Sequence, residues 1–144
     1  MRQKEANTQK TTEDIVDSVL RFVLATRGNK WQTSRVWYVS GPSPTLDLSA
    51  TKKRLHRQWK RVDISKGTDF LPEAGGYTIV RVAEITLLPN NSASAFVRVQ
   101  HVGEYDYKSH RRGYNLWEWV TIQLIKRNAT WQMLGLKDSW KQSD

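Results

Sequence analysis

The chain of 144 residues has no cysteine and only three histidines. Without cysteine it can form no disulfide bond, thiolate metal site or cysteine nucleophile. The histidines lack the spacing of metal ligands, and no glycine-rich phosphate loop, GxSxG sequence or HExxH sequence is present. The sequence therefore contains no recognised catalytic motif and predicts no metal and no other cofactor.

Long apolar runs are missing as well. The uncharged apolar stretches are far shorter than the ~20 residues of a membrane-spanning helix. The first ten residues are polar and lack the apolar region of a secretory signal. Hydrophobic residues still make up 38% of the chain and charged residues 26%, which is typical of a folded protein. We expect a flexible tail, residues 1–10, followed by a single domain, residues 11–144.

The first half of the domain has helical periodicity. Thr11 and Asp14 have the spacing of a capping box, and Gly28 suits the end of a helix that begins at Thr11. Apolar residues then recur on one helical face: Ile15, Val19, Phe22 and Val23, with Val16 and Leu20 beside them. Residues 31–39 fit a strand or a helix. Residues 49–62 predict a second helix with Leu55, Trp59 and Val62 on its apolar face.

The second half predicts strands separated by turn residues. The four expected strands span residues 77–88, 93–107, 114–126 and 131–140, and Gly103 is a candidate for a bulge. Two N-glycosylation sequons, beginning at Asn90 and Asn128, fall in the predicted turns. Because helices and strands are segregated along the chain, we expect an α+β fold in which N-terminal helices pack on a strongly curved antiparallel sheet.

Positive charge dominates the composition. The 23 lysines and arginines against 14 acidic residues give a formal net charge of +9, which favours nucleic acid, anionic lipid or an acidic protein face as partner. Residues 52–61 contain no acid and predict one basic face of the second helix, and a basic turn at residues 108–112 extends this surface. The candidate interaction residues are Lys53, Arg54, Arg57, Lys60, Arg61, Arg111 and Arg112. The alternative interpretation is a solvated helix face and a surface hairpin.

Seven tryptophans are expected to supply much of the core. Trp117 and Trp119 alternate along a strand and so share a sheet face, where they either fill the core beneath the helices or form an aromatic docking surface. His101 and Tyr105 also share a strand face. These side chains, in the pocket of a curved sheet, keep a small-molecule enzyme open as a hypothesis.

The predicted order of two helices and a curved antiparallel meander resembles the nuclear-transport-factor-2-like cone. Within that superfamily the chain is similar to the soluble domain of the VirB8/TrbF-type assembly subunits of type IV secretion and conjugation machines. The similarity rests on short sequences, from the first helix to the last strands: Phe22-Val23, Arg27, Trp31, Ser40-Gly41-Pro42, Ala95-Phe96-Val97-Arg98-Val99 and Asn128 through Leu136. In the last of these, Ala129 replaces the proline of the family pattern.

The resemblance implies a non-catalytic scaffold. Its partners would be other secretion-channel subunits and further copies of the chain. Its place would be the periplasmic face of the inner membrane, with a membrane anchor outside this sequence. The alternatives from the residues alone are a nucleic-acid or anionic-surface binding domain and the small-molecule enzyme.

Overall fold

The first helix is longer than its sequence predicts. The computed structural model describes residues 2–27, 36–43, 45–58, 62–64, 77–102, 115–138 and 140–143. Helix α1 spans Arg2–Arg27, so the predicted start at Thr11 is wrong. The predicted end at Gly28 falls outside the described residues. Side-chain pairs one turn apart support its polar part, because Lys10 Nζ lies 3.3 Å from Asp14 Oδ1 and Gln9 donates a hydrogen bond to Glu13.

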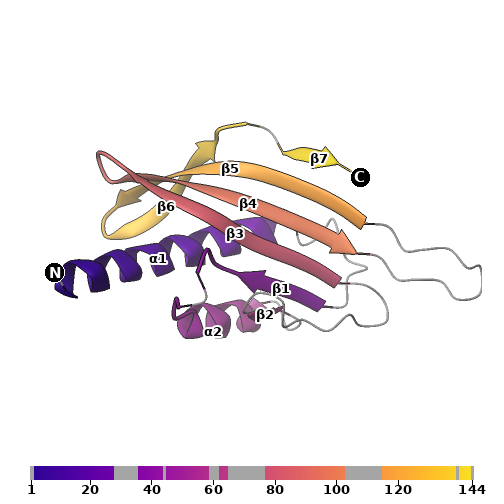
Figure 1. Ribbon diagram of the computed structural model, residues 1–144, viewed down its shortest axis with the longest axis horizontal. Coiled ribbons are helices and arrows are strands. Elements are labelled where there is room, and N and C mark those ends of the chain that lie inside the picture. Colours follow the sequence, from indigo (N-terminus) through magenta and orange to yellow (C-terminus); the bar gives the residue numbers. More distant parts are fainter. Residues whose placement is uncertain are drawn as a thin grey trace, which may run out of the picture.

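In the described residues, seven strands form one open, mixed sheet in the order β2-β1-β3-β4-β5-β6, with β7 paired to β5 (Figure 1). The strands are β1 (Val36–Ser40), β2 (Val62–Ile64), β3 (Tyr77–Leu88), β4 (Ser92–Val102), β5 (Asn115–Arg127), β6 (Thr130–Leu136) and β7 (Lys141–Ser143). The predicted α+β class is confirmed. The expectation of a wholly antiparallel sheet is wrong, because β1 runs parallel to both β2 and β3.

The parallel part of the sheet arises where the second helix is shorter than predicted. Helix α2 spans Ser49–Gln58, and Val62 belongs to β2, where it pairs with Trp37 of β1. Two parallel strands need a crossover connection, and α2 lies in the one that joins β1 to β2. Val62 and Ile64 are β-branched, which favours a strand over a helical end. Residues 59–61 lie outside the described part of the chain.

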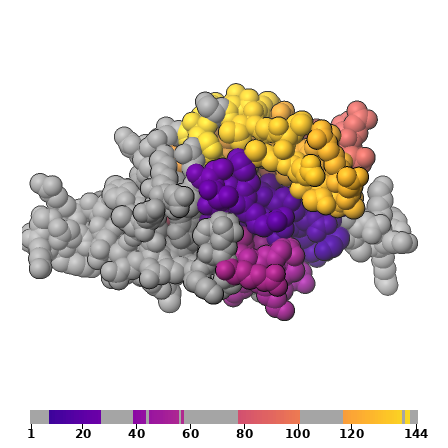
Figure 2. All heavy atoms as spheres, turned by 180° about the vertical axis from the view of Figure 1, so that it is seen from behind, coloured from indigo at the N-terminus to yellow at the C-terminus, as the bar shows by residue number. Residues whose placement is uncertain are grey.

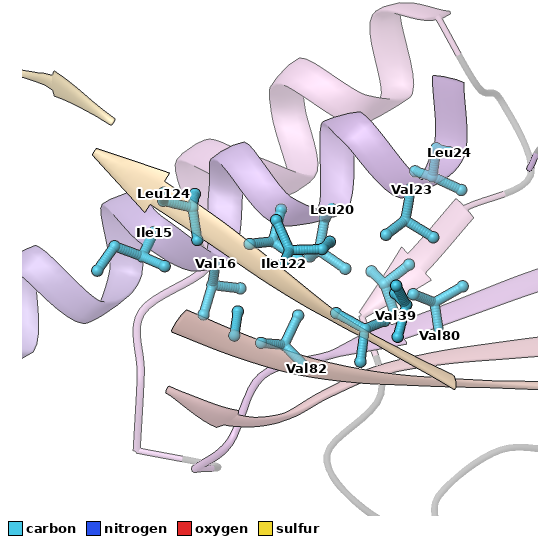
Figure 3. Packing of buried hydrophobic residues seen from close by; sticks show 14 of the residues in the cluster. Ile15, Val16, Leu20, Val23, Leu24, Val39, Val80, Val82, Ile122 and Leu124 are labelled. Atoms are coloured by element: carbon cyan, nitrogen blue, oxygen red, sulfur yellow. The ribbon is translucent and has the colours of Figure 1, made fainter. Parts of the chain in front are cut away.

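The core forms between α1 and one face of the sheet (Figure 3). The predicted apolar face of α1 is confirmed, with Phe22 partly buried beside it. The buried core side chains of α1 are Ile15, Val16, Val19, Leu20, Val23 and Leu24. Alternate residues of the three longest strands face them: Val80, Val82, Ala93, Ala95, Val97, Val99, Val120, Ile122 and Leu124. We call this the inner face of the sheet. Ser18 Oγ also donates a hydrogen bond of 3.0 Å to the carbonyl of Trp131, which fixes α1 to β6.

Among the described residues, aliphatic side chains fill most of this core. Among the described side chains, Trp131 is the one buried tryptophan, and Trp140 is partly buried against the core. Trp119 is partly exposed and Trp117 is 37% exposed. They alternate with buried Glu118 and Val120 and so lie on the sheet face opposite α1. The interpretation that they fill the core beneath the helices is therefore wrong.

Tight turns join β3 to β4 and β5 to β6. The predicted turns at Asn90 and Asn128 are confirmed, and the backbone takes positive φ at two consecutive residues in each: Asn90 and Asn91 after β3, and Asn128 and Ala129 after β5. The predicted basic turn at residues 108–112 lies outside the described residues. Register shifts lie between Val82 and Glu84 and between Gln123 and Leu124. The predicted bulge at Gly103 falls outside the described residues.

Ala129 gives a direct test of the second turn. Its φ of 63° is costly for any residue with a Cβ, by about 1–2 kcal/mol, whereas glycine adopts this conformation freely. Glycine loses more chain entropy on folding than alanine does, which offsets part of this gain. We therefore expect Ala129→Gly to raise the free energy of unfolding by about 0.5–1 kcal/mol. Chemical denaturation measures this. The control, Ala25→Gly at an exposed position of α1, should lower stability by about 1 kcal/mol, and a destabilising Ala129→Gly would contradict the turn geometry.

Candidate interaction surfaces

A buried carboxylate joins the two helices. Asp17 of α1 is 6% exposed, and its carboxylate forms ion pairs with two arginines. Arg54 of α2 places Nη2 2.8 Å and Nε 3.0 Å from Asp17 Oδ1, and Arg21 Nη2 lies 3.1 Å from Oδ2. Arg54, predicted as part of an interaction surface, is therefore engaged in holding α2 against α1. Sequence reasoning missed Asp17, although it lies among the apolar positions of the helix.

The Asp17–Arg54 pair should contribute to stability more than an exposed ion pair does. We expect Arg54→Met to lower the free energy of unfolding by about 1–3 kcal/mol, because it leaves a buried carboxylate with fewer donors. The neighbouring exposed Lys53→Met should change it by no more than about 0.5 kcal/mol. A double-mutant cycle with Asp17→Asn measures the coupling, and strictly additive effects would show that the pair has no structural role.

The turn before α2 is hydrogen-bonded to α1. Glu13 Oε1 accepts hydrogen bonds from the Asp47 amide at 3.0 Å and from Gln9 at 3.2 Å. Asp47 Oδ1 accepts in turn from the hydroxyl and the amide of Ser49, the first residue of α2. These hydrogen bonds from Ser49 lower the pKa of Asp47 below its ordinary value of 3.8. Of the two smaller effects, burial raises this pKa and the positive charge of Lys10 lowers it.

The lowered pKa of Asp47 predicts a pH-dependent contribution to stability. A carboxyl whose pKa falls on folding stabilises the native state above its unfolded pKa, and this contribution is lost as the pH falls through the lower native value. We expect Asp47→Asn to be less stable than the parent chain at neutral pH and equally stable well below pH 3.8. Denaturation curves of the two proteins across this range measure the difference. A stability gap that does not change with pH would refute the role of the charge.

The basic face of α2 is described in part. Lys53 and Arg57 are exposed one turn apart on this helix, as predicted, and Leu55 is fully buried on the other side. Figure 2 shows α2 beside α1 on the face of the molecule that lies behind the sheet in Figure 1. The predicted residues Lys60, Arg61, Arg111 and Arg112 lie outside the described residues. A continuous basic surface thus stays a prediction.

The outer face of the sheet, opposite α1, carries aromatic and basic side chains on β3, β4 and β5. Arg81 pairs directly with Arg98, and Arg98 pairs with Trp119. Both arginines are exposed, and the Arg98 guanidinium lies 5.4 Å from the centroid of the Phe96 ring. Neither of the two described helices, α1 and α2, crosses in front of these strands in Figure 1. Of this surface, the sequence predicted only that Trp117 and Trp119 share a face.

The β6 edge is a second exposed apolar feature. Strand β6 is an end of the strand order and pairs with β5 on one side. Met133 is 42%, Leu134 57% and Leu136 37% exposed. The strand has no charged residue from Thr130 to Leu136. An uncharged edge strand with exposed apolar side chains is a typical site for pairing with another chain.

Glu118 is a buried acid that sequence reasoning missed. It is 2% exposed and lies on the inner face, where it pairs with Val99 of β4 and Gln142 of β7. The even spacing of Glu118, Val120, Ile122 and Leu124 along β5 would have placed it there. Thr78 is also buried on this face, two residues along β3 from the partner of Val99.

No family model, curated protein or solved structure matches the chain. In the part of the chain that the structure describes, no three acidic or histidine side chains are grouped as they would be around a metal ion. The described helices include none with the length and apolarity to cross a membrane.

Proposed function

We propose that the chain is a non-catalytic assembly subunit of a type IV secretion or conjugative transfer machine, acting through protein–protein contacts. The short sequences that resemble the VirB8/TrbF-type subunits support this proposal. The packing of a long N-terminal helix on one face of a sheet, which is the coarse arrangement that the resemblance implies, also supports it. Under this proposal the domain lies at the periplasmic face of the inner membrane, and its anchor lies outside the present sequence.

The observation that carries the proposal is the exposed apolar edge at β6. Met133, Leu134 and Leu136 remain exposed, although Met133 and Leu136 pair with the buried Leu124 and Ile122 of β5. An edge strand of this kind offers main-chain hydrogen bonds and apolar side-chain contacts to a further strand. A subunit that acts by contact, rather than by chemistry, needs such a surface.

The absence of charge on β6 favours a second copy of the chain as the partner that pairs with this edge. The chain carries a net charge of +9, so most surfaces of two copies repel each other. Strand β6 is uncharged between Arg127 and Lys137, and two antiparallel copies centred on Met133 and Leu134 would place neither cation opposite a like charge. An isologous contact of this type is the commonest symmetry of homo-oligomers.

The β6 edge is tested by charge insertion. We expect Leu134→Lys to raise the dissociation constant of the self-associated chain at least tenfold, because it removes apolar contact and places a cation of each copy within the interface. Sedimentation velocity across protein concentration measures this constant. Leu87→Lys is the matched control, since Leu87 is 48% exposed but lies on β3. Equal effects of the two substitutions, or a monomeric parent chain, would exclude pairing through β6.

The function itself is tested in the natural host. Deletion of the gene should abolish transfer of a mobilisable plasmid to recipient cells, and the intact gene supplied in trans should restore it. Normal transfer by the deletion strain would refute the proposed function.

The second candidate function is binding of nucleic acid, which the exposed Lys53 and Arg57 on α2 favour. Such binding would weaken steeply as salt concentration rises, because each phosphate contact releases counterions. A duplex titrated at two salt concentrations distinguishes this candidate from the first.

A further inference from the structure

The outer face contains an arrangement that the isolated fold does not favour. Arg81 and Arg98 are direct cross-strand partners on β3 and β4. Side chains at such positions have Cβ atoms about 4.5–5.5 Å apart, and like charges there destabilise a sheet. In the described part of the chain neither arginine has an ion-pair partner, although Glu84 lies on the same face.

Aromatic side chains surround this pair of cations. Trp119 pairs with Arg98, and Trp117, 37% exposed, lies two residues further along β5. Phe96 lies under the Arg98 guanidinium, which limits the directions that this side chain can take. Tryptophan and arginine are the residues that most often dominate the energy of protein interfaces.

From this arrangement we propose that the outer face of β3, β4 and β5 docks an acidic segment of another protein. A glutamate or aspartate of that segment binds between Arg81 and Arg98, and its neighbouring apolar side chains pack on Trp117 and Trp119. A carboxylate offers two oxygens to two guanidinium groups, and these charge-assisted hydrogen bonds are stronger than neutral ones. The repulsion between the arginines is relieved in the complex. The proposal rests on the proposed function, for which it names the chemistry of one partner.

The charges on this face argue against other occupants. A second copy placed face to face would bring four arginines together between two chains of +9 charge. A nucleic acid gains affinity from many phosphate contacts. Among the cross-strand pairs of β3 and β4 from Ile79 to Glu84, the positive charges are those of Arg81 and Arg98. The negative charge of Glu84 on the same face repels a polyanion. One carboxylate flanked by apolar residues fits both the two cations and the tryptophans.

A peptide titration tests the site. The probe is a short, acetylated and amidated peptide of alternating leucine and glutamate, and the reference peptide has glutamine in place of each glutamate. In NMR spectra of the full chain we expect the glutamate peptide to shift amides of residues 79–84, 96–100 and 117–121. Arg81→Gln with Arg98→Gln should weaken its binding about tenfold or more, the effect of losing hydrogen bonds to a charged group.

A charge-matched control removes the same two positive charges elsewhere. Lys126→Gln with Lys137→Gln, both at exposed positions, should leave the affinity for the glutamate peptide within about twofold of the parent value. The spectra of both double variants report whether the sheet is intact. If the double arginine variant does not fold, Arg98→Lys serves instead, because it keeps the charge and loses the planar donor pair.

Three results would overturn the proposal: equal affinity for the glutamate and glutamine peptides, amide shifts confined to α2, or an oligothymidylate that binds this face through the two arginines. The transfer assay separates its failure from that of the proposed function. Rescue of the deletion strain by the double arginine variant as well as by the parent gene would refute docking at this face and leave the assembly role intact. Normal transfer without the gene would refute the assembly role, whatever the peptide result.

Discussion

The packing of α1 against the inner face of the sheet is the interaction on which the rest of this structure depends. Six aliphatic side chains of the helix are buried there, the most exposed of them at 1%. Each contributes about 1.5–3 kcal/mol on burial, so that together they are comparable with the net stability of a whole domain, roughly 5–15 kcal/mol. The helix also positions other elements, because Asp17 holds α2 through Arg54 and Ser18 holds β6 through the carbonyl of Trp131.

In the part of the chain that the structure describes, α1 packs on one side of the sheet and the other side carries exposed side chains. A strand that buries alternate residues under α1 must direct the residues between them outward, and on β3, β4 and β5 these include arginines and tryptophans rather than the small polar residues of an inert surface. The β6 edge differs from this face in carrying apolar side chains without charge. The two surfaces therefore suit different occupants, an acidic partner for the outer face and a second copy for the edge, as a subunit within a larger assembly requires.

Periodicity predicted the long elements well and failed where a local pattern competed with a tertiary contact. The turn residues before and after β3 gave its bounds, and the apolar spacing from Ile15 to Val23 identified the buried face of α1. Thr11 and Asp14 have capping-box spacing, but they lie inside a helix whose polar turns are stabilised by their own side-chain pairs. Val62 continues the apolar spacing of α2, yet it pairs with Trp37 in the sheet.

The interaction surfaces were less predictable, because they depend on register. Charge density along the chain selected Arg54, whose role is set by a contact with Asp17, and it overlooked Arg81 and Arg98, which become neighbours only when β3 pairs with β4. Trp117 and Trp119 were assigned to one face correctly, but alternation alone does not tell which face the helix covers.

The most direct test of the central claim, that the outer face and the β6 edge are contact surfaces, is oxidative footprinting of the chain alone and within the isolated assembly. The account predicts that Trp117 and Met133 are oxidised readily in the isolated chain and are protected in the assembly, whereas buried Trp131 is protected in both. Equal oxidation of Trp117 and Met133 in the two samples would contradict it.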